Sequence, residues 1–187
     1  MSVPNRYAGF FADSRLPMKG SVILSHGLES GPQATKVSAL AQVCDALGWG
    51  SVRPDYRDID ARRDVREIDA RIAYLLEHVP NQGRVVLAGS SMGAFISGLA
   101  SLRIACDGLF LLAVPIAVKG YSLAFDAAAV PSALVHGWRD ELCAVEPVIE
   151  FARTRAATLH LVDDDHRLGA HVELCAQLFG QFLGGLG

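Results

Sequence analysis

The chain has 187 residues, of which 51% are hydrophobic and 20% are charged, and its formal net charge at pH 7 is −3. This length and composition are typical of one globular enzyme domain spanning residues 1–187, and they exclude an intrinsically disordered chain. The small negative charge, with basic residues interleaved among acidic ones, argues against nucleic acid or an anionic membrane surface as a partner.

The sequence shows neither the pattern of a signal peptide nor an apolar run long enough to span a membrane. Met1 to Arg15 lack the apolar central run of a signal peptide, and the longest apolar run, Leu109 to Val118, is too short to span a bilayer. We therefore expect a cytoplasmic protein without membrane insertion.

Short apolar runs alternate along the chain with longer stretches in which apolar residues recur at helical spacing. This alternation predicts an α/β fold, with a mostly parallel twisted sheet of about six or seven strands and helices on both faces. We expect strands at 22–24, 51–53, 85–88, 109–114, 133–135 and 159–162, with an additional edge strand at 7–12. We expect helices at 35–47, 63–79, 94–104, 145–156 and 171–183.

Polar residues follow four of these predicted strands directly. His26 comes after the first strand, Ser91 after the third, Asp140 after the fifth and His166 after the sixth. Because the carboxyl ends of parallel strands meet at one edge of a sheet, where such folds bind ligands, these four residues are expected to converge.

The strongest motif is the run Gly89-Ser90-Ser91-Met92-Gly93, which fits the G-x-S-x-G pattern of a nucleophile elbow. A sharp turn from strand to helix holds the central serine out from the backbone, and the crowding requires small residues two positions before and after it. Ser91 is therefore the candidate nucleophile, and Ser90 is not. The alternative is a glycine-rich turn that carries an ordinary serine.

Taken together, the elbow, the His26-Gly27 loop, the run His136-Gly137-Trp138-Arg139-Asp140 and the late Asp165-His166 resemble the α/β-hydrolase fold family. The resemblance covers nearly the whole chain, from Val22 to the final helix. It implies a catalytic triad in the order serine, acid, histidine, which assigns Ser91, Asp140 and His166. It also implies no large cap domain, because the interval from Pro115 to Ser132 is short.

In this triad His166 would act as general base and Asp140 would fix the tautomer of its ring. Other histidines have competing explanations: His26 is expected to brace its loop, and His136, at a strand end, is expected to be packed and satisfied. The neighbouring acids 163–165 are an alternative source of the carboxylate, although we favour a capping role for most of them.

An oxyanion hole needs backbone donors beside the nucleophile. The N–H of Met92, directly after Ser91, is one candidate, and the N–H of Leu28 is the second, because Gly27 allows its loop to approach closely. The alternative is a plain connection between strand and helix that has no such role.

The substrate-binding walls are expected to include Trp138, Pro115 and Ile116, although Trp138 could equally be an anchor of the core. The segment 118–123 is expected to form a small helix or flap. The charged stretch 57–71 is interpreted as the solvated face of a helix, and Glu29 is a candidate contact for a cationic substrate group.

These features predict a serine hydrolase that cleaves carboxylic esters through an acyl-enzyme on Ser91. The partner would be a small acyl ester or thioester, with no cofactor, and no metal site is expected from four scattered cysteines. The alternatives are an acyl thioesterase, an amidase or peptidase of the same fold, and a non-catalytic binding module on this scaffold.

Overall fold

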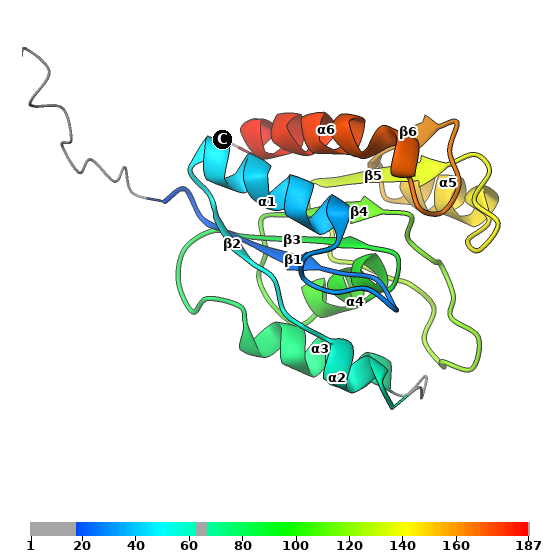
Figure 1. Ribbon diagram of the computed structural model, residues 1–187, viewed down its shortest axis with the longest axis horizontal. Helices are drawn as coiled ribbons and strands as arrows, with labels where there is room; N and C mark the ends of the chain where they lie inside the picture. The colour runs from blue at the N-terminus through cyan, green and yellow to red at the C-terminus, as the bar shows by residue number, and fades with distance from the viewer. Residues whose placement is uncertain (1–17, 63–66, 187) are drawn as a thin grey trace, which may run out of the picture.

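A single open sheet forms the centre of the protein in the computed structural model, which describes residues 18–62 and 67–186 (Figure 1). Its six strands pair in parallel in the order β2-β1-β3-β4-β5-β6. They are β1 (Ser21–Ser25), β2 (Gly50–Val52), β3 (Val85–Ser90), β4 (Gly108–Leu112), β5 (Ser132–Gly137) and β6 (Thr158–Val162). The predicted parallel sheet is confirmed, whereas the edge strand expected at 7–12 lies outside the described residues.

Helices lie in each connection between successive strands except the one from β4 to β5, and a last helix follows β6. They are α1 (Thr35–Leu47), α2 (Arg57–Asp60), α3 (Glu67–Glu77), α4 (Met92–Ser101), α5 (Val145–Thr154) and α6 (Val172–Gly185), with a 3₁₀ turn η1 (Gly169–His171) before α6. The helix expected at 63–79 is shorter at its C-terminus, since Pro80 disfavours the helical conformation at the residue before it. Residues 63–66 lie outside the described part of the chain.

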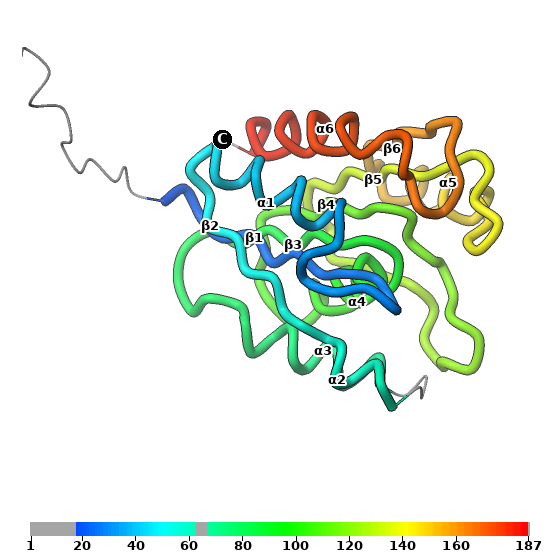
Figure 2. Tube along the Cα trace, viewed as in Figure 1, coloured from blue at the N-terminus to red at the C-terminus, as the bar shows by residue number. Residues whose placement is uncertain are grey.

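Two hydrophobic layers enclose the sheet, one on each face. Because side chains alternate along a strand, Ile23 and Leu87 join one layer, while Val22 and Leu24 join the other. The first layer includes residues of α3, α4 and α5, and the second includes residues of α1 and α6. Figures 1 and 2 show α1 and α6 side by side over one face and α3 on the opposite side. The predicted coverage of both faces is confirmed.

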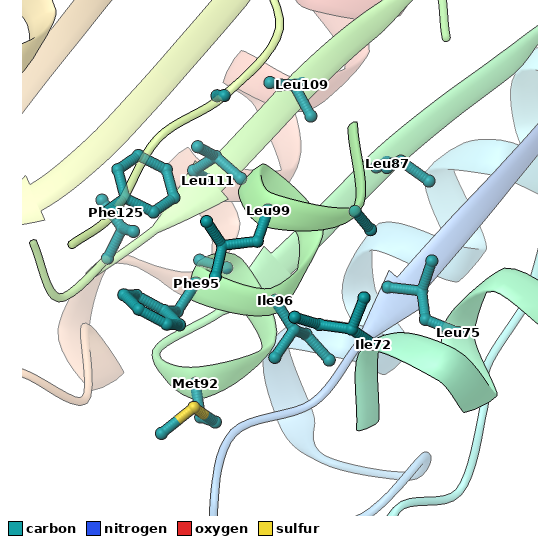
Figure 3. Close-up of a cluster of buried hydrophobic side chains, with 14 of the residues drawn as sticks. Ile72, Leu75, Leu87, Met92, Phe95, Ile96, Leu99, Leu109, Leu111 and Phe125 are labelled. Carbon is teal, nitrogen blue, oxygen red and sulfur yellow. The ribbon is translucent and has the colours of Figure 1, made fainter. Parts of the chain in front are cut away.

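The central helix α4 is the most deeply buried of the described helices, since all ten of its residues are buried. In Figure 3, Phe95, Ile96 and Leu99 of this helix lie among side chains of α3 and of the strands. Shortening one such side chain to alanine typically costs about 2–5 kcal/mol. The packing therefore holds the start of α4, and with it Ser91, in a fixed position.

The interval between β4 and β5, residues 113–131, contains neither helix nor strand, so no cap domain is inserted there. The small helix expected at 118–123 is not formed: this segment is an irregular loop with a turn in which Tyr121 N–H donates to Val118 O. Among the described helices, none combines the length and apolarity needed to cross a membrane.

Candidate active site

The bend between β3 and α4 has the geometry that the sequence predicts for an elbow. Ser91 has φ 54° and ψ −121°, a conformation that L residues rarely adopt and that surrounding packing must enforce. A Cβ at Gly89 would lie 2.4 Å from the carbonyl carbon of Gly93, and a Cβ at Gly93 would lie 2.1 Å from Ser25 O. Both glycines are therefore required by steric contact with the backbone.

Ser91, His166 and Asp140 lie in one hydrogen-bonded line. Ser91 Oγ is 2.8 Å from His166 Nε2, and His166 Nδ1 is 2.8 Å from Asp140 Oδ2. An ionised carboxylate only accepts, so Nδ1 carries the ring proton and Nε2 is left as the acceptor for the Ser91 hydroxyl. The sheet brings together three residues that lie up to 75 positions apart in the chain.

Backbone donors orient the Asp140 carboxylate, whose side chain is fully buried. Its Oδ1 accepts the N–H groups of Leu142 at 3.0 Å and Cys143 at 2.8 Å. His166 Nδ1 lies 2.8 Å from Oδ2 and 3.0 Å from Oδ1, so Oδ2, which accepts no backbone N–H, is its closer partner. The alternative acids are engaged elsewhere: Asp163 pairs with Arg139, and Asp164 accepts from the His171 ring.

The two predicted oxyanion donors belong to residues that line the same cleft as Ser91. Neither the N–H of Leu28 nor that of Met92 donates to another residue in the described part of the chain. A Cβ at Gly27 would lie 3.4 Å from Ser91 Cβ, so the loop after β1 closely approaches the elbow. Both N–H groups thus remain available to an oxygen bound beside Ser91.

His26 braces this loop, as the sequence predicts. Its Nδ1 donates to Gly27 O at 2.8 Å, and its Nε2 accepts the N–H of Tyr56 at 3.0 Å. Burial lowers the pKa of His26, so the ring is neutral at pH 7. The ring therefore ties the loop after β1 to the loop after β2.

The interpretation of 57–71 as a solvated helix face is wrong for Arg71, which is buried. Its side chain is only 1% exposed, Nη2 donates to His26 O at 2.8 Å, and the guanidinium lies over the Tyr56 ring. Asp60 faces it at 3.5 Å, and burial raises the pKa of Asp60 and lowers that of Arg71. A sequence signal existed: Arg71 falls on the apolar stripe formed with Ile68, Ile72 and Leu75.

The cleft beside Ser91 has a volume of about 1500 Å³, and its walls mix apolar and charged groups. Leu28 and Leu142 are exposed apolar residues at its edge, and Lys36 and Glu29 are among the charged ones. Lys36 Nζ donates to the carbonyl of Arg167, directly after His166, and thus supports that loop from α1.

Three residues expected in the substrate-binding wall are not among those that line this cleft. Ile116 packs instead against the buried layer that contains α4, and Pro115 precedes it in the same irregular segment. Trp138 is not a core anchor either, since it is 55% exposed. Pro115 and Ile116 belong to the irregular segment 113–131, which no periodicity predicts and of which Val118 lines the cleft instead.

The described residues contain one group that could ligate a metal, namely Asp140, Cys143 and His166, whose donor atoms lie within 4.8 Å of one another. Asp140 and His166 are already hydrogen-bonded to each other, and burial raises the pKa of the Cys143 thiol to about 12. The donor set is thus unsuited to a resident metal, because the thiolate is the ligand form.

A parallel six-stranded sheet covered on both faces, with a serine at the strained bend after β3, defines the α/β-hydrolase fold. A family model described as an alpha/beta hydrolase domain matches residues 18–173. The chain therefore belongs to the alpha/beta hydrolase family. No curated protein matches it significantly.

Solved structures agree with this membership. A protein of the α/β superfamily from Xanthomonas campestris pv. campestris is 46% identical with a TM-score of 0.86, over 89% of this chain and 99% of that one. An alpha-beta serine hydrolase homologue from Coxiella burnetii is 23% identical, with a TM-score of 0.72 over 89% and 86% of the two chains. A serine hydrolase without lid from Xanthomonas campestris is 19% identical, with a TM-score of 0.70 over 90% and 83%. The last two similarities concern the fold alone.

Proposed function

We propose that this protein is a serine hydrolase that cleaves small carboxylic esters through an acyl-enzyme on Ser91. The observation that supports this most is the line of two 2.8 Å contacts from Ser91 Oγ through the His166 ring to Asp140. The order of protons in that line is the one that base catalysis requires, because the free lone pair of the ring faces the hydroxyl.

In the acylation step, Ser91 Oγ attacks the carbonyl carbon of the ester while His166 Nε2 takes the hydroxyl proton. The negative charge on the resulting tetrahedral oxygen is stabilised by the N–H groups of Leu28 and Met92, the latter at the positive end of the α4 dipole. The intermediate collapses as His166 returns the proton to the departing alkoxide. Asp140 balances the charge on the imidazolium throughout.

Deacylation repeats these steps with water in place of the alcohol. His166 takes a proton from the water as its oxygen attacks the acyl carbon, and then returns the proton to Ser91 Oγ as the acid product leaves. The absence of a cap between β4 and β5 leaves the cleft open to substrate and water. Exposed Leu28 and Leu142 at its edge would contact the apolar part of an acyl group.

The test uses a fluorophosphonate probe and a p-nitrophenyl ester of a short acid. The wild-type protein should become labelled and should release p-nitrophenol, and Ser91→Ala should lose both activities with an unchanged Tm. Ser90→Ala is the matched control and should retain both, because the His166 ring bonds to the hydroxyl of Ser91 and not to that of its neighbour Ser90. Labelling that persists in Ser91→Ala would rule out the nucleophile, and a folded wild-type protein that does neither would favour the non-catalytic binding module.

A matched set of ester, thioester and amide substrates with one acyl group would assign the bond that is cleaved. We expect the highest kcat/KM for the ester or thioester, because an amine is the poorest leaving group of the three. A preference for the amide would instead assign an amidase or peptidase.

A further inference from the structure

A second histidine contacts the same carboxylate oxygen of Asp140 as His166 does. His136 is in β5, one residue before the strand ends, and its side chain is only 1% exposed. Its Nε2 is 2.8 Å from the carbonyl oxygen of Cys143. A carbonyl oxygen only accepts, so Nε2 of His136 must carry a proton.

The same nitrogen is 3.2 Å from Asp140 Oδ2, the oxygen that also faces His166 Nδ1 at 2.8 Å. Two imidazole rings therefore contact Oδ2, while Oδ1 accepts two backbone N–H groups and lies 3.0 Å from His166 Nδ1. The N–H of His136 thus lies between the acid and the carbonyl of Cys143, at the end of the loop that carries the acid.

The environment of the other ring nitrogen of His136, Nδ1, indicates that a histidine stands at this position because of the Nε2 contact and not because of packing. Its Nδ1 is buried and has no hydrogen-bond partner among the described residues. An unsatisfied buried polar atom is costly, and an apolar side chain would avoid that cost. The expectation of a packed, fully satisfied imidazole was therefore wrong for one of the two ring nitrogens. The unpartnered Nδ1 also favours the neutral ring, since a charged ring would bury a second N–H without an acceptor.

We propose that His136 is a positioning residue for the acid, which extends the line to Ser91–His166–Asp140–His136. Its N–H donates to the carbonyl of Cys143 and lies against Oδ2, and it thus holds the 140–143 loop and the carboxylate in the orientation that keeps Oδ2 on His166 Nδ1. Asp140 therefore cannot rotate away while the His166 ring gains and loses charge. This inference rests on the proposed function, because it acts only through the triad.

Two nearly isosteric substitutions separate the N–H from the volume of the ring. His136→Gln keeps a donor at about the reach of Nε2, whereas His136→Met has similar length and no donor. Since a hydrogen bond near a charged group is worth roughly 10- to 100-fold, we expect His136→Met to lower kcat by about that factor with KM nearly unchanged. His136→Gln should stay within about threefold of wild type.

The matched control is His160→Met on the adjacent strand β6. His160 is half-buried and hydrogen-bonds no described side chain, so this variant should keep the wild-type kcat. A cycle with Asp140→Asn tests whether His136 acts through the acid: His136→Met should cause no further loss in that background. A merely structural effect would lower the rate again.

A spectroscopic readout needs no variant. In the ¹⁵N-labelled wild-type protein, long-range ¹H–¹⁵N spectra should show His136 as the neutral tautomer protonated at Nε2, and the tautomer protonated at Nδ1 would overturn the proposal. So would a wild-type kcat in folded His136→Met, or a loss in His136→Gln as large as that in His136→Met. Should the wild-type protein itself fail to hydrolyse or become labelled, the proposed function fails. If the wild-type protein hydrolyses the ester and becomes labelled, and His136→Met has the same kcat, only this inference fails.

Discussion

Asp140→Asn tests the proposed mechanism sharply, because the backbone around Asp140 decides how the new amide must lie. Oδ1 accepts two N–H groups, from Leu142 at 3.0 Å and Cys143 at 2.8 Å. Asparagine can accept only through its carbonyl oxygen, so that oxygen must take the Oδ1 position. The NH₂ group then takes the Oδ2 position, which faces His166 Nδ1 at 2.8 Å.

The size of the effect follows from this forced orientation. The NH₂ group donates, so the closer contact requires His166 Nδ1 to accept, and the ring proton then moves to the nitrogen that faces Ser91. The one contact that could keep the proton on Nδ1 is the longer one, 3.0 Å to the Oδ1 position, whose oxygen already accepts two backbone N–H groups. A ring protonated at Nε2 cannot take the Ser91 proton, and the corresponding change in a serine protease triad lowers kcat about 10⁴-fold. This factor corresponds to about 5.4 kcal/mol of transition-state stabilisation. The new NH₂ also faces the N–H of His136, so we expect the free energy of unfolding to fall by about 1–3 kcal/mol.

The assay is single-turnover release of p-nitrophenol, with thermal unfolding as the measure of stability. Asp163→Asn is the control, because that side chain is 82% exposed, precedes His166 by three residues and, among the described residues, pairs with Arg139 alone. Its rate should remain within about twofold of wild type, since exposed ion pairs contribute little. If Asp140→Asn retained more than about a tenth of the wild-type rate, the tautomer argument would be refuted. A concurrent loss in Asp163→Asn would transfer the acid role to residues 163–165.

Three further predictions concern the scaffold of the site. Arg71→Met removes the hydrogen bond to His26 O and leaves Asp60 buried without its cation. The free energy of unfolding, measured by denaturant titration, should therefore fall by about 3–5 kcal/mol. An unchanged value would mean that the Arg71–Asp60 pair is solvated. Because the pKa of His26 is lowered in the folded state, the unfolded chain binds more protons below its ordinary value of 6.5. The contribution of neutral His26 to the free energy of unfolding is therefore fully present above about pH 6.5 and is lost as the pH falls below it. His26→Gln should flatten this pH dependence of the Tm in melts between pH 5 and 8. Gly93→Ala should abolish folding or activity through its 2.1 Å contact, whereas Gly184→Ala, with no atom within 4 Å, should raise the Tm through an increase of about 0.5–1 kcal/mol.

The three residues of the proposed triad could be selected from sequence because each lies within a few residues of the end of a strand. Strand ends are well determined by short apolar runs, and parallel pairing then carries Ser91, Asp140 and His166 to one edge of the sheet. Helix boundaries were less accurate: the helix expected from residue 94 begins at Met92, because the elbow turns directly into α4. Periodicity reports the buried face of a helix and not the turn that starts it.

Residues outside regular elements could not be placed in this way. Pro115 and Ile116 were expected in the substrate-binding wall but do not line the cleft, and the loop in which they lie has no periodicity that predicts its path. Arg71 was misjudged for the opposite reason. Its charge suggested solvent, whereas its position on an apolar helix face and the carbonyl of His26 within reach favour burial. Composition alone cannot show that the buried carbonyl of His26 accepts a hydrogen bond from Arg71.

The geometry between acid and base depends on pairing that continues beyond the strands. After β5 and β6 end, Trp138 N–H still donates to Val162 O at 2.8 Å, and Arg139 N–H donates to Asp164 O at 3.0 Å. These two bonds join the loop before Asp140 to the loop before His166. The 2.8 Å contact between acid and base is therefore set by backbone hydrogen bonds and does not depend on side-chain packing alone.

This pairing also accounts for the glycine in the run His136-Gly137-Trp138-Arg139-Asp140. A Cβ at Gly137 would lie 2.4 Å from the carbonyl oxygen of Asp164 and 2.7 Å from that of Asp165. Any larger residue would push the loop that carries His166 away from β5, and hence away from Asp140. In sequence this glycine looks like an ordinary turn residue. In the fold, the absence of a side chain at Gly137 lets the loop that carries His166 pack directly against β5. This close packing determines how near His166 lies to Asp140.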